Sequence, residues 1–270
     1  IEAMLGEPAD VAFPPLPPAP AADAPVLLEV AGLSSATGLS DIRLKVKAGE
    51  IVGLIGLVGS GRSELARAIF GADPSTGTVR VGGAAYDDRS PRLSVQRGLA
   101  FVPEDRRKQG LDLVQTVRPN MSLPHLSLVS RFGVLKPRDE RRRTAEMIEH
   151  FNIVPGQIDG EVAFYSGGNQ QKVLLSKWVY GNPKVVILDE PSRGVDIGAR
   201  RRIHDFVVEL ARGGAAVLLI SSELEEVISL SHRGYLMRDG RIIGEADCRT
   251  LTVEDALFRL FNVEKQMGAA

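Results

Sequence analysis

Apolar and polar positions along the chain define two kinds of segment. Four short runs are almost wholly apolar, which is typical of strands buried on both faces: residues 51–56, 98–102, 184–189 and 215–221. Between the last two runs, residues 198–214 carry apolar side chains at helical spacing and end at a glycine pair. Strands and helices in alternation predict an α/β fold, in which helices cover both faces of a parallel sheet.

Other segments add strands at both ends of this pattern and helix in the middle. VLLEV at residues 26–30 and IRLKVKAGE at 42–50 predict strands, and HRGYLMRDGRIIGE at 232–245 predicts a hairpin with an Asp-Gly turn. Strand signals disappear from about residue 106 to 164, where KPRDERRRTAEMIEHF predicts a charged helix. We interpret residues 106–164 as a helical subdomain inserted into the sheet domain.

The N-terminal region differs in composition from everything after it. FPPLPPAPAADAP, at residues 13–25, is rich in proline and alanine and predicts a semi-rigid linker. We expect residues 1–25 to be the tail of a preceding domain followed by this linker, and residues 26–270 to form one folded domain. The chain starts at Ile1 and has no signal-peptide pattern, so we expect it to be a piece of a longer protein.

Composition narrows the classes of function. The 270 residues are 44% hydrophobic and 25% charged, as in ordinary soluble domains, and the net charge of -1 argues against a nucleic-acid partner. No apolar run approaches the roughly 20 residues that cross a bilayer, so the chain is predicted to be soluble and to act at a membrane only through a partner. The single Cys248 excludes a disulfide within the chain. The four histidines lack metal-ligand spacing, and we interpret His204 as a surface or helix-packing residue.

The first candidate site follows the apolar run at residues 51–56. GLVGSGRSEL, at residues 56–65, lies between a predicted strand and a predicted helix, as a phosphate-binding loop does. Backbone N–H groups of this loop can converge on a phosphate, and Ser63 stands where a hydroxyl binds Mg²⁺. Arg62 replaces the usual lysine and keeps the charge, but not the compact ammonium group. The candidate nucleotide-binding residues here are Gly56, Gly59, Ser60, Gly61, Arg62, Ser63 and Glu64.

A pair of carboxylates ends the apolar run at residues 184–189. Asp189 and Glu190 would be costly to bury there without a function. We predict that Asp189 holds Mg²⁺ through water and that Glu190 polarises an attacking water molecule. Together with the upstream loop, these two residues predict a site for ATP and Mg²⁺.

YSGGNQQKVLLSKWV, at residues 165–179, points to a family. It resembles the signature sequence of ATP-binding cassette (ABC) proteins, in the LSGGNQQK form of importers for sugars. The resemblance covers nearly everything after the linker, including ILDEPSRGVDIGAR at residues 187–200 and LISSELEEV at 219–227 in the switch position. It implies a P-loop NTPase fold with a RecA-like parallel sheet core, an antiparallel β subdomain and the inserted α-helical subdomain.

The resemblance also implies partners. Two cassettes of this family stack head to tail around two ATP molecules, and the signature of one contacts the nucleotide on the other. Ser166 can cap the signature helix while Gly167 and Gly168 offer N–H groups to the γ-phosphate, with Gln170 and Asp196 as further candidate contacts. In the sugar-importer branch both cassettes are fused, so this chain resembles the second half.

The implied assembly therefore has three partners. They are an N-terminal cassette of the same polypeptide, a transmembrane permease and, indirectly, a periplasmic sugar-binding protein. The implied location is peripheral, at the cytoplasmic face of a bacterial inner membrane. Because the permease and the binding protein select the substrate, a nucleoside importer is an open alternative to a sugar importer.

Several positions depart from the family pattern, all in the chain's own ATP site. Besides Arg62, Glu104 replaces a glutamine that meets Mg²⁺ and water, and Ser222 replaces the switch histidine. No aromatic residue at 32–41 can stack on adenine, a contact worth on the order of 1 kcal/mol. The catalytic candidates are Glu190, Glu104 and Ser222, and the metal candidates are Ser63, Asp189 and Glu104.

These departures predict a division of labour between two sites. The chain is expected to bind ATP on its own loop and hydrolyse it weakly, while its signature completes a competent site on the partner cassette. A regulatory ATP-binding module that never hydrolyses is an open alternative. A soluble cassette of translation or DNA repair is disfavoured by the net charge of -1 and the single short helical insertion.

Overall fold

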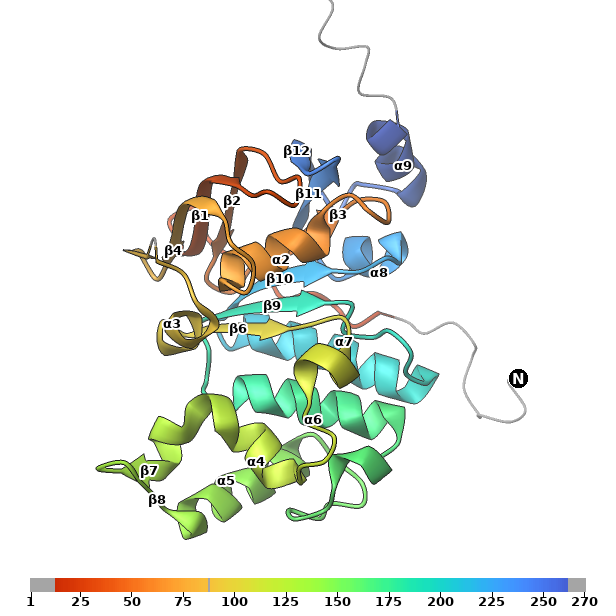
Figure 1. Cartoon of the computed structure of the whole chain (residues 1–270). Helices are drawn as coiled ribbons and strands as arrows, with labels where there is room; N and C mark the ends of the chain where they lie inside the picture. Colours follow the sequence, from red (N-terminus) through yellow and green to blue (C-terminus); the bar gives the residue numbers. More distant parts are fainter. Residues whose placement is uncertain (1–12, 87, 262–270) are drawn as a thin grey trace, which may run out of the picture.

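A mixed sheet forms the centre of the computed structural model, which describes residues 13–86 and 88–261 (Figure 1). Its strand order is β12-β11-β3-β10-β9-β6, and all neighbours pair in parallel except β11 with β12. The strands are β3 (Ile51–Ile55), β6 (Leu99–Val102), β9 (Val185–Asp189), β10 (Ala216–Ile220), β11 (Arg233–Arg238) and β12 (Arg241–Asp247). The four apolar runs predicted as buried strands are thus confirmed as β3, β6, β9 and β10.

Several helices pack against the strands of this sheet. α2 contacts β6 and β9, α7 contacts β10, and α8 contacts β3 and β11. Their bounds, with those of α3, α6 and α9, are α2 (Arg62–Phe70), α3 (Pro91–Gln96), α6 (Gly167–Val179), α7 (Ile197–Arg212), α8 (Leu224–Ser229) and α9 (Val253–Phe261). Within the described part of the chain, none of the helices is both long and apolar enough to cross a membrane.

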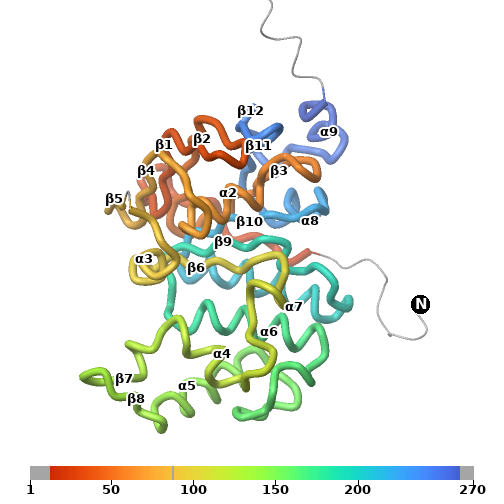
Figure 2. Tube along the Cα trace, in the orientation of Figure 1, coloured from red at the N-terminus to blue at the C-terminus, as the bar shows by residue number. Residues whose placement is uncertain are grey.

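A second, antiparallel sheet lies at one end of the molecule, and a helical lobe lies at the other (Figure 2). The sheet has the order β2-β1-β4-β5, with β1 (Val26–Ser34), β2 (Ile42–Lys47), β4 (Thr76–Val81) and β5 (Ala84–Tyr86). Along β2 the apolar side chains are buried and the basic ones between them are exposed, because one face packs on the core. The antiparallel β subdomain is confirmed.

The helical lobe contains one element that the sequence pattern did not predict. It comprises η1 (Arg106–Gly110, a π-helix), α4 (Val117–Ser122), η2 (Leu123–Val129), α5 (Pro137–His150) and η3 (Val162–Phe164). The expectation that this region has no strands is wrong, because β7 (Ser130–Arg131) pairs with β8 (Val134–Leu135). Each strand has only two residues, too few for an alternating pattern, and the turn uses positive φ at Phe132 and Gly133.

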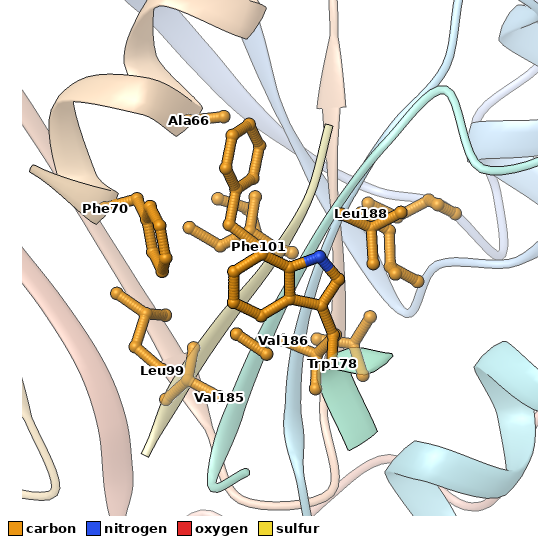
Figure 3. Packing of buried hydrophobic residues seen from close by; sticks show 14 of the residues in the cluster. Ala66, Phe70, Leu99, Phe101, Trp178, Val185, Val186 and Leu188 are labelled. Carbon is orange, nitrogen blue, oxygen red and sulfur yellow. The ribbon is translucent and has the colours of Figure 1, made fainter. Parts of the chain in front are cut away.

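Aromatic side chains fill the space where α2, β6 and α6 meet (Figure 3). Phe70 of α2 lies 5.4 Å from Phe101 of β6 and 5.4 Å from Trp178 of α6, measured between ring centroids. Burial of such rings contributes a large share of core stability. Trp178 is therefore a packing residue that joins α6 to α2 and the sheet.

The proline-rich segment lies against the folded domain. Residues 13–25 contain no helix or strand, yet Phe13 and Leu16 pack against the main core. Lys47 Nζ donates a hydrogen bond to the carbonyl oxygen of Ala22 at 2.8 Å, and Ala48 N donates to that of Pro25 at 2.9 Å. The domain boundary at residue 26 stays a prediction, and residues 1–12 lie outside the described residues.

Candidate nucleotide-binding site

The glycine loop after β3 ends at an uncapped helix. Gly59 and Gly61 have φ values of 83° and 99°, a left-handed conformation that favours glycine. A Cβ on residue 56 would lie 2.5 Å from Ser60 Oγ and 2.6 Å from the Met237 carbonyl oxygen, so only glycine fits there. The N-cap of α2 is Gly61, without a side-chain cap. The first N–H groups of α2 are consequently open to an anionic ligand.

Arg62 turns into the protein. Its side chain is only 7% exposed, and Nη1 donates a hydrogen bond of 2.5 Å to the carbonyl oxygen of Ser221. Burial lowers the pKa of this guanidinium, while the charges of Glu190 and Asp189 oppose that effect. Arg62 therefore acts in this structure as an internal cation between the end of β10 and the two carboxylates.

Asp189 is a buried carboxyl group with one oxygen to spare. The residue is 2% exposed, and burial raises its pKa to about 6 although a hydrogen bond from Ser63 opposes the effect. Among the described residues, Oδ1 of Asp189 has no hydrogen-bond partner. A buried oxygen without a partner, next to a hydroxyl, fits the oxygen ligands that Mg²⁺ prefers.

Glu190 is held by the residue in the switch position. Ser222 Oγ donates a hydrogen bond to Glu190 Oε2 at 3.1 Å. Burial raises the pKa of Glu190, and the bond from Ser222 and the charge of Arg62 oppose that change. The φ of Glu190 is 52°, a strained conformation that is common at functional sites. The hydroxyl of Ser222 is thus hydrogen-bonded to Glu190, the predicted base.

Glu104 forms an ion pair that the sequence did not indicate. Its carboxylate contacts the guanidinium of Arg193, which lies three residues after Glu190 in the chain. The carbonyl oxygen of Arg193 in turn accepts a hydrogen bond of 3.4 Å from Arg106 Nη1. These partners are far apart in the sequence, so no local spacing could have paired them.

The start of the signature helix α6 has the predicted geometry. Ser166 caps it by accepting a hydrogen bond from the backbone N of Asn169 at 3.4 Å, and Ser166 itself is exposed. A Cβ on residue 167 would lie 2.8 Å from Arg106 Nη2, so Gly167 lets this arginine approach the helix. The predicted cap is confirmed, and the N-terminal N–H groups of α6 lie near the surface beside Arg106.

Two residues predicted to contact a ligand make hydrogen bonds within the protein, and Asp196 is nevertheless exposed. Gln170 is 2% exposed, and its Nε2 donates to the carbonyl oxygen of Val162 at 3.1 Å, so it supports the segment before the signature. Asp196 caps α7 by accepting from the backbone N of Ala199 at 2.8 Å. A direct nucleotide contact by Gln170 stays a prediction, and in this structure its amide supports the segment before the signature. Periodicity alone could not reveal this, because Gln170 lies within the first turn of α6, beside the exposed cap.

The predicted residues form two groups. One group surrounds the start of α2 and the ends of β9 and β10, and the other surrounds the start of α6. Of the loop residues, Glu64 pairs with Arg67 at 3.2 Å on the outer part of α2. The structure thus brings the loop, both carboxylates and Ser222 together, and it adds Ser221, Arg193 and Arg106 as neighbours that the sequence did not indicate.

Comparison with known sequences agrees with this geometry. The family model described as ABC transporter matches residues 39–193. The chain is 42% identical over 259 residues to the ribose import ATP-binding protein RbsA of Rhodococcus jostii, covering 96% of this chain and 51% of that protein. It is 46% identical over 226 residues to a protein of Agrobacterium fabrum whose name proposes ribose, galactose or methyl galactoside import, covering 83% and 45%. The chain spans about half the length of the curated relatives it matches.

Solved structures share the fold. A dimeric bacterial ABC transporter cassette, MJ0796, superposes with a TM-score of 0.72 at 21% identity, covering 83% of this chain and 100% of that chain. A nucleotide-free cassette from an ABC transporter superposes with a TM-score of 0.70 at 23% identity, covering 82% of this chain and 91% of that chain. The predicted fold class, a P-loop NTPase with a parallel core sheet, is confirmed.

Proposed function

This chain belongs to the ABC transporter family, and on that premise we propose that it is the C-terminal ATP-binding cassette of a carbohydrate importer. Relatives at 42% to 46% identity carry names of ribose or galactose import ATP-binding proteins. Since the chain covers only 45% to 51% of their length, an N-terminal cassette on the same polypeptide is part of the proposal.

ATP is the proposed ligand of the loop at residues 56–63. The observation that carries this proposal is the uncapped start of α2, with Ser63 bonded to a buried Asp189 just behind it. Loop N–H groups and the helix dipole favour a triphosphate there. Ser63 and the free Oδ1 of Asp189 would hold Mg²⁺, which when bound neutralises phosphate charge.

Hydrolysis at this site is proposed to be weak. Arg62 donates a hydrogen bond to the carbonyl oxygen of Ser221, and Ser222 donates one to Glu190. Glu104 forms an ion pair with Arg193. Each of these groups must leave its partner before it can contact the γ-phosphate or the attacking water. Loss of one preorganised contact to transition-state charge typically costs about 10²-fold in rate.

The signature is proposed to serve the other cassette. Its capped and surface-near start favours a phosphate bound outside this chain. The partner is the N-terminal cassette, in the head-to-tail arrangement that the family resemblance implies. This chain would then contribute Ser166, Gly167 and Gly168 to the site where most turnover occurs.

A permease is the proposed membrane partner. A groove of about 820 Å³ lies between the core and the helical lobe, lined by Val95 of α3, Trp178 of α6 and exposed leucines of η2. Leu123, Leu126 and Leu128 are 63%, 42% and 43% exposed. Exposed apolar surface of this kind favours a protein partner. The cassette would then lie on the cytoplasmic face of the membrane, with a periplasmic sugar-binding protein as an indirect partner.

Calorimetric titration of the chain with Mg·ATP tests this proposal. We expect binding with a Kd below about 1 mM, and at least about tenfold weaker binding in Ser63→Ala, because the hydroxyl at the metal site is lost. Ser127→Ala, an exposed serine of η2, is the matched control and should bind like the unchanged chain. No association of the unchanged chain with Mg·ATP would refute the proposal.

A regulatory module that never hydrolyses is the second candidate, and the contacts of Arg62 and Ser222 favour it. The assembled transporter distinguishes the two. If Asp189→Asn and Glu190→Gln leave both ATP turnover and transport unchanged, the site is regulatory. If either variant lowers turnover, the site contributes to hydrolysis.

A further inference from the structure

A buried polar pair lies outside every contact used so far. His204 of α7 and Glu226 of α8 are 1% and 2% exposed, and Nε2 of His204 lies 2.6 Å from Oε1 of Glu226. Burial alone would raise the pKa of Glu226, but hydrogen bonding from His204 lowers it, so the carboxylate is ionised and accepts a hydrogen bond from Nε2–H. An ionised group in such a dry place stabilises the fold only while its partners stay in position.

On one side, the N-terminal segment covers this pair. The ring of Phe13 stacks on the imidazole of His204, with centroids 5.1 Å apart and an interplanar angle of 23°. Arg212 Nη2 donates a hydrogen bond of 3.1 Å to the carbonyl oxygen of Pro15. Nε2 of His232 lies 3.0 Å from the carbonyl oxygen of Pro17. Residues 13–17 are therefore bound beside α7, where Figure 1 shows the first described residues.

On the other side, Glu226 faces the nucleotide site. The buried residues Ser192 and Ser221 contribute to the lowered pKa of Glu226, while among the described residues Oε2 of Glu226 and Nδ1 of His204 have no hydrogen-bond partner. The geometric link runs through α8, because its N-cap residue Glu223 donates a backbone hydrogen bond of 3.1 Å to Ser221 Oγ. Ser221 follows β10, and its carbonyl oxygen accepts the hydrogen bond from Arg62. Ser192 lies two residues after Glu190. The carboxylate thus sits between the two segments that carry the catalytic side of the site.

We propose that His204 and Glu226 are positioning residues, which transmit the docking of residues 13–17 to the nucleotide site. The inference rests on the proposed function of that site. While Phe13 covers His204, the pair stays dry and fixes α7 against α8, whose N-cap residue Glu223 holds Ser221 by a hydrogen bond. When Phe13 leaves, water reaches the pair, its hydrogen bond weakens, and the acceptor of Arg62 loses its support. Nucleotide affinity therefore responds to the position of the segment that leads into the cassette.

Phe13→Ala in the full chain is the first test. Hydrogen exchange without nucleotide should become at least about threefold faster in peptides covering residues 190–196 and 219–224, because the local structure opens more often. Affinity for Mg·ATP should fall about fivefold, the equivalent of one aromatic stack. Phe258→Ala removes a ring that is 67% exposed on α9, and it is the matched control without effect.

Variants of the pair test whether the effect passes through it. His204→Phe keeps a ring for Phe13 to stack on but removes the donor, and it should give the same faster exchange as Phe13→Ala. Glu226→Gln keeps an acceptor for His204 and should stay within about twofold of the unchanged affinity. Adding Phe13→Ala to His204→Phe should then have no further effect on exchange or affinity, because the pair is already disconnected.

The outcomes separate this inference from the proposed function. Unchanged exchange in Phe13→Ala, or effects of Phe13→Ala and His204→Phe that multiply independently, would overturn the inference. If the unchanged chain binds no Mg·ATP, the proposed function fails, and the exchange measurements still decide whether Phe13 and the pair act on residues 190–196.

Discussion

Replacing Asp189 with asparagine should stabilise the nucleotide-free chain at neutral pH. The carboxyl group is 2% exposed, and one of its oxygens has no partner within the described residues. Burial raises its pKa from an ordinary 3.8 to about 6. Asparagine has the same shape and cannot ionise, and its carbonyl oxygen can still accept the hydrogen bond from Ser63. The substitution therefore removes the cost of a buried charge without leaving a cavity.

The raised pKa of Asp189 sets the size of the expected difference in unfolding free energy. A pKa of about 6 in the folded chain against 3.8 corresponds to about 3 kcal/mol, since each pH unit is worth about 1.4 kcal/mol. The stability that protonation of Asp189 provides is complete below pH 3.8, and it is lost as the pH rises through 6. Above about pH 7 the variant should exceed the unchanged chain by about 2–3 kcal/mol, and below about pH 4 the two should be alike.

Urea unfolding of both proteins in EDTA, followed by circular dichroism from about pH 4 to pH 8, measures this difference. Asp239→Asn is the matched control, because that side chain is 90% exposed and should show no such pH dependence. Equal unfolding free energies at about pH 8, or a difference that does not grow with pH, would refute the reasoning. With Mg·ATP present the order should reverse, because only the unchanged chain gains stability from the bound metal and nucleotide.

Three further predictions concern the loop and the signature. Arg62→Lys should raise the weak ATP turnover of the isolated chain by about tenfold or more, because an ammonium group can contact phosphate oxygens as a point charge; equal or lower turnover would contradict this. Gly56→Ala should destabilise the chain by about 2 kcal/mol or more in urea unfolding, since its Cβ would meet the Met237 carbonyl oxygen at 2.6 Å. In the proposed two-cassette polypeptide, Ser166→Arg should nearly abolish turnover while Ser222→Ala changes it less than about threefold; the opposite ranking would disprove the proposed division of labour.

Local pattern was sufficient for the strands, the loop and the signature. The strand that ends in Asp189 and the helix that follows Ser166 were both predicted from apolar runs, glycine positions and a capping residue. These features depend on backbone geometry over a few neighbouring residues, so they can be predicted from the sequence alone. The β7–β8 hairpin was missed because two-residue strands leave no periodic signal.

The direction of each polar side chain depended on the assembled protein. Arg62 was expected to face a phosphate, but it reaches Ser221 across the strand ends. Glu104 was expected near a metal, and it pairs with Arg193. Such contacts join residues far apart in the chain, and they depend on which neighbours packing brings within about 3 Å.

By itself, then, the sequence determined the order of elements, the family resemblance and the positions of the phosphate loop and signature, because these arise from short-range spacing. Only the tertiary structure decided that the Gln170 amide donates to the carbonyl oxygen of Val162 and that His204 is buried against Glu226 beneath Phe13. Burial removes water as a hydrogen-bond partner, so most buried polar groups pair with whatever neighbour the fold provides, while a few atoms, such as Asp189 Oδ1, have none within the described residues.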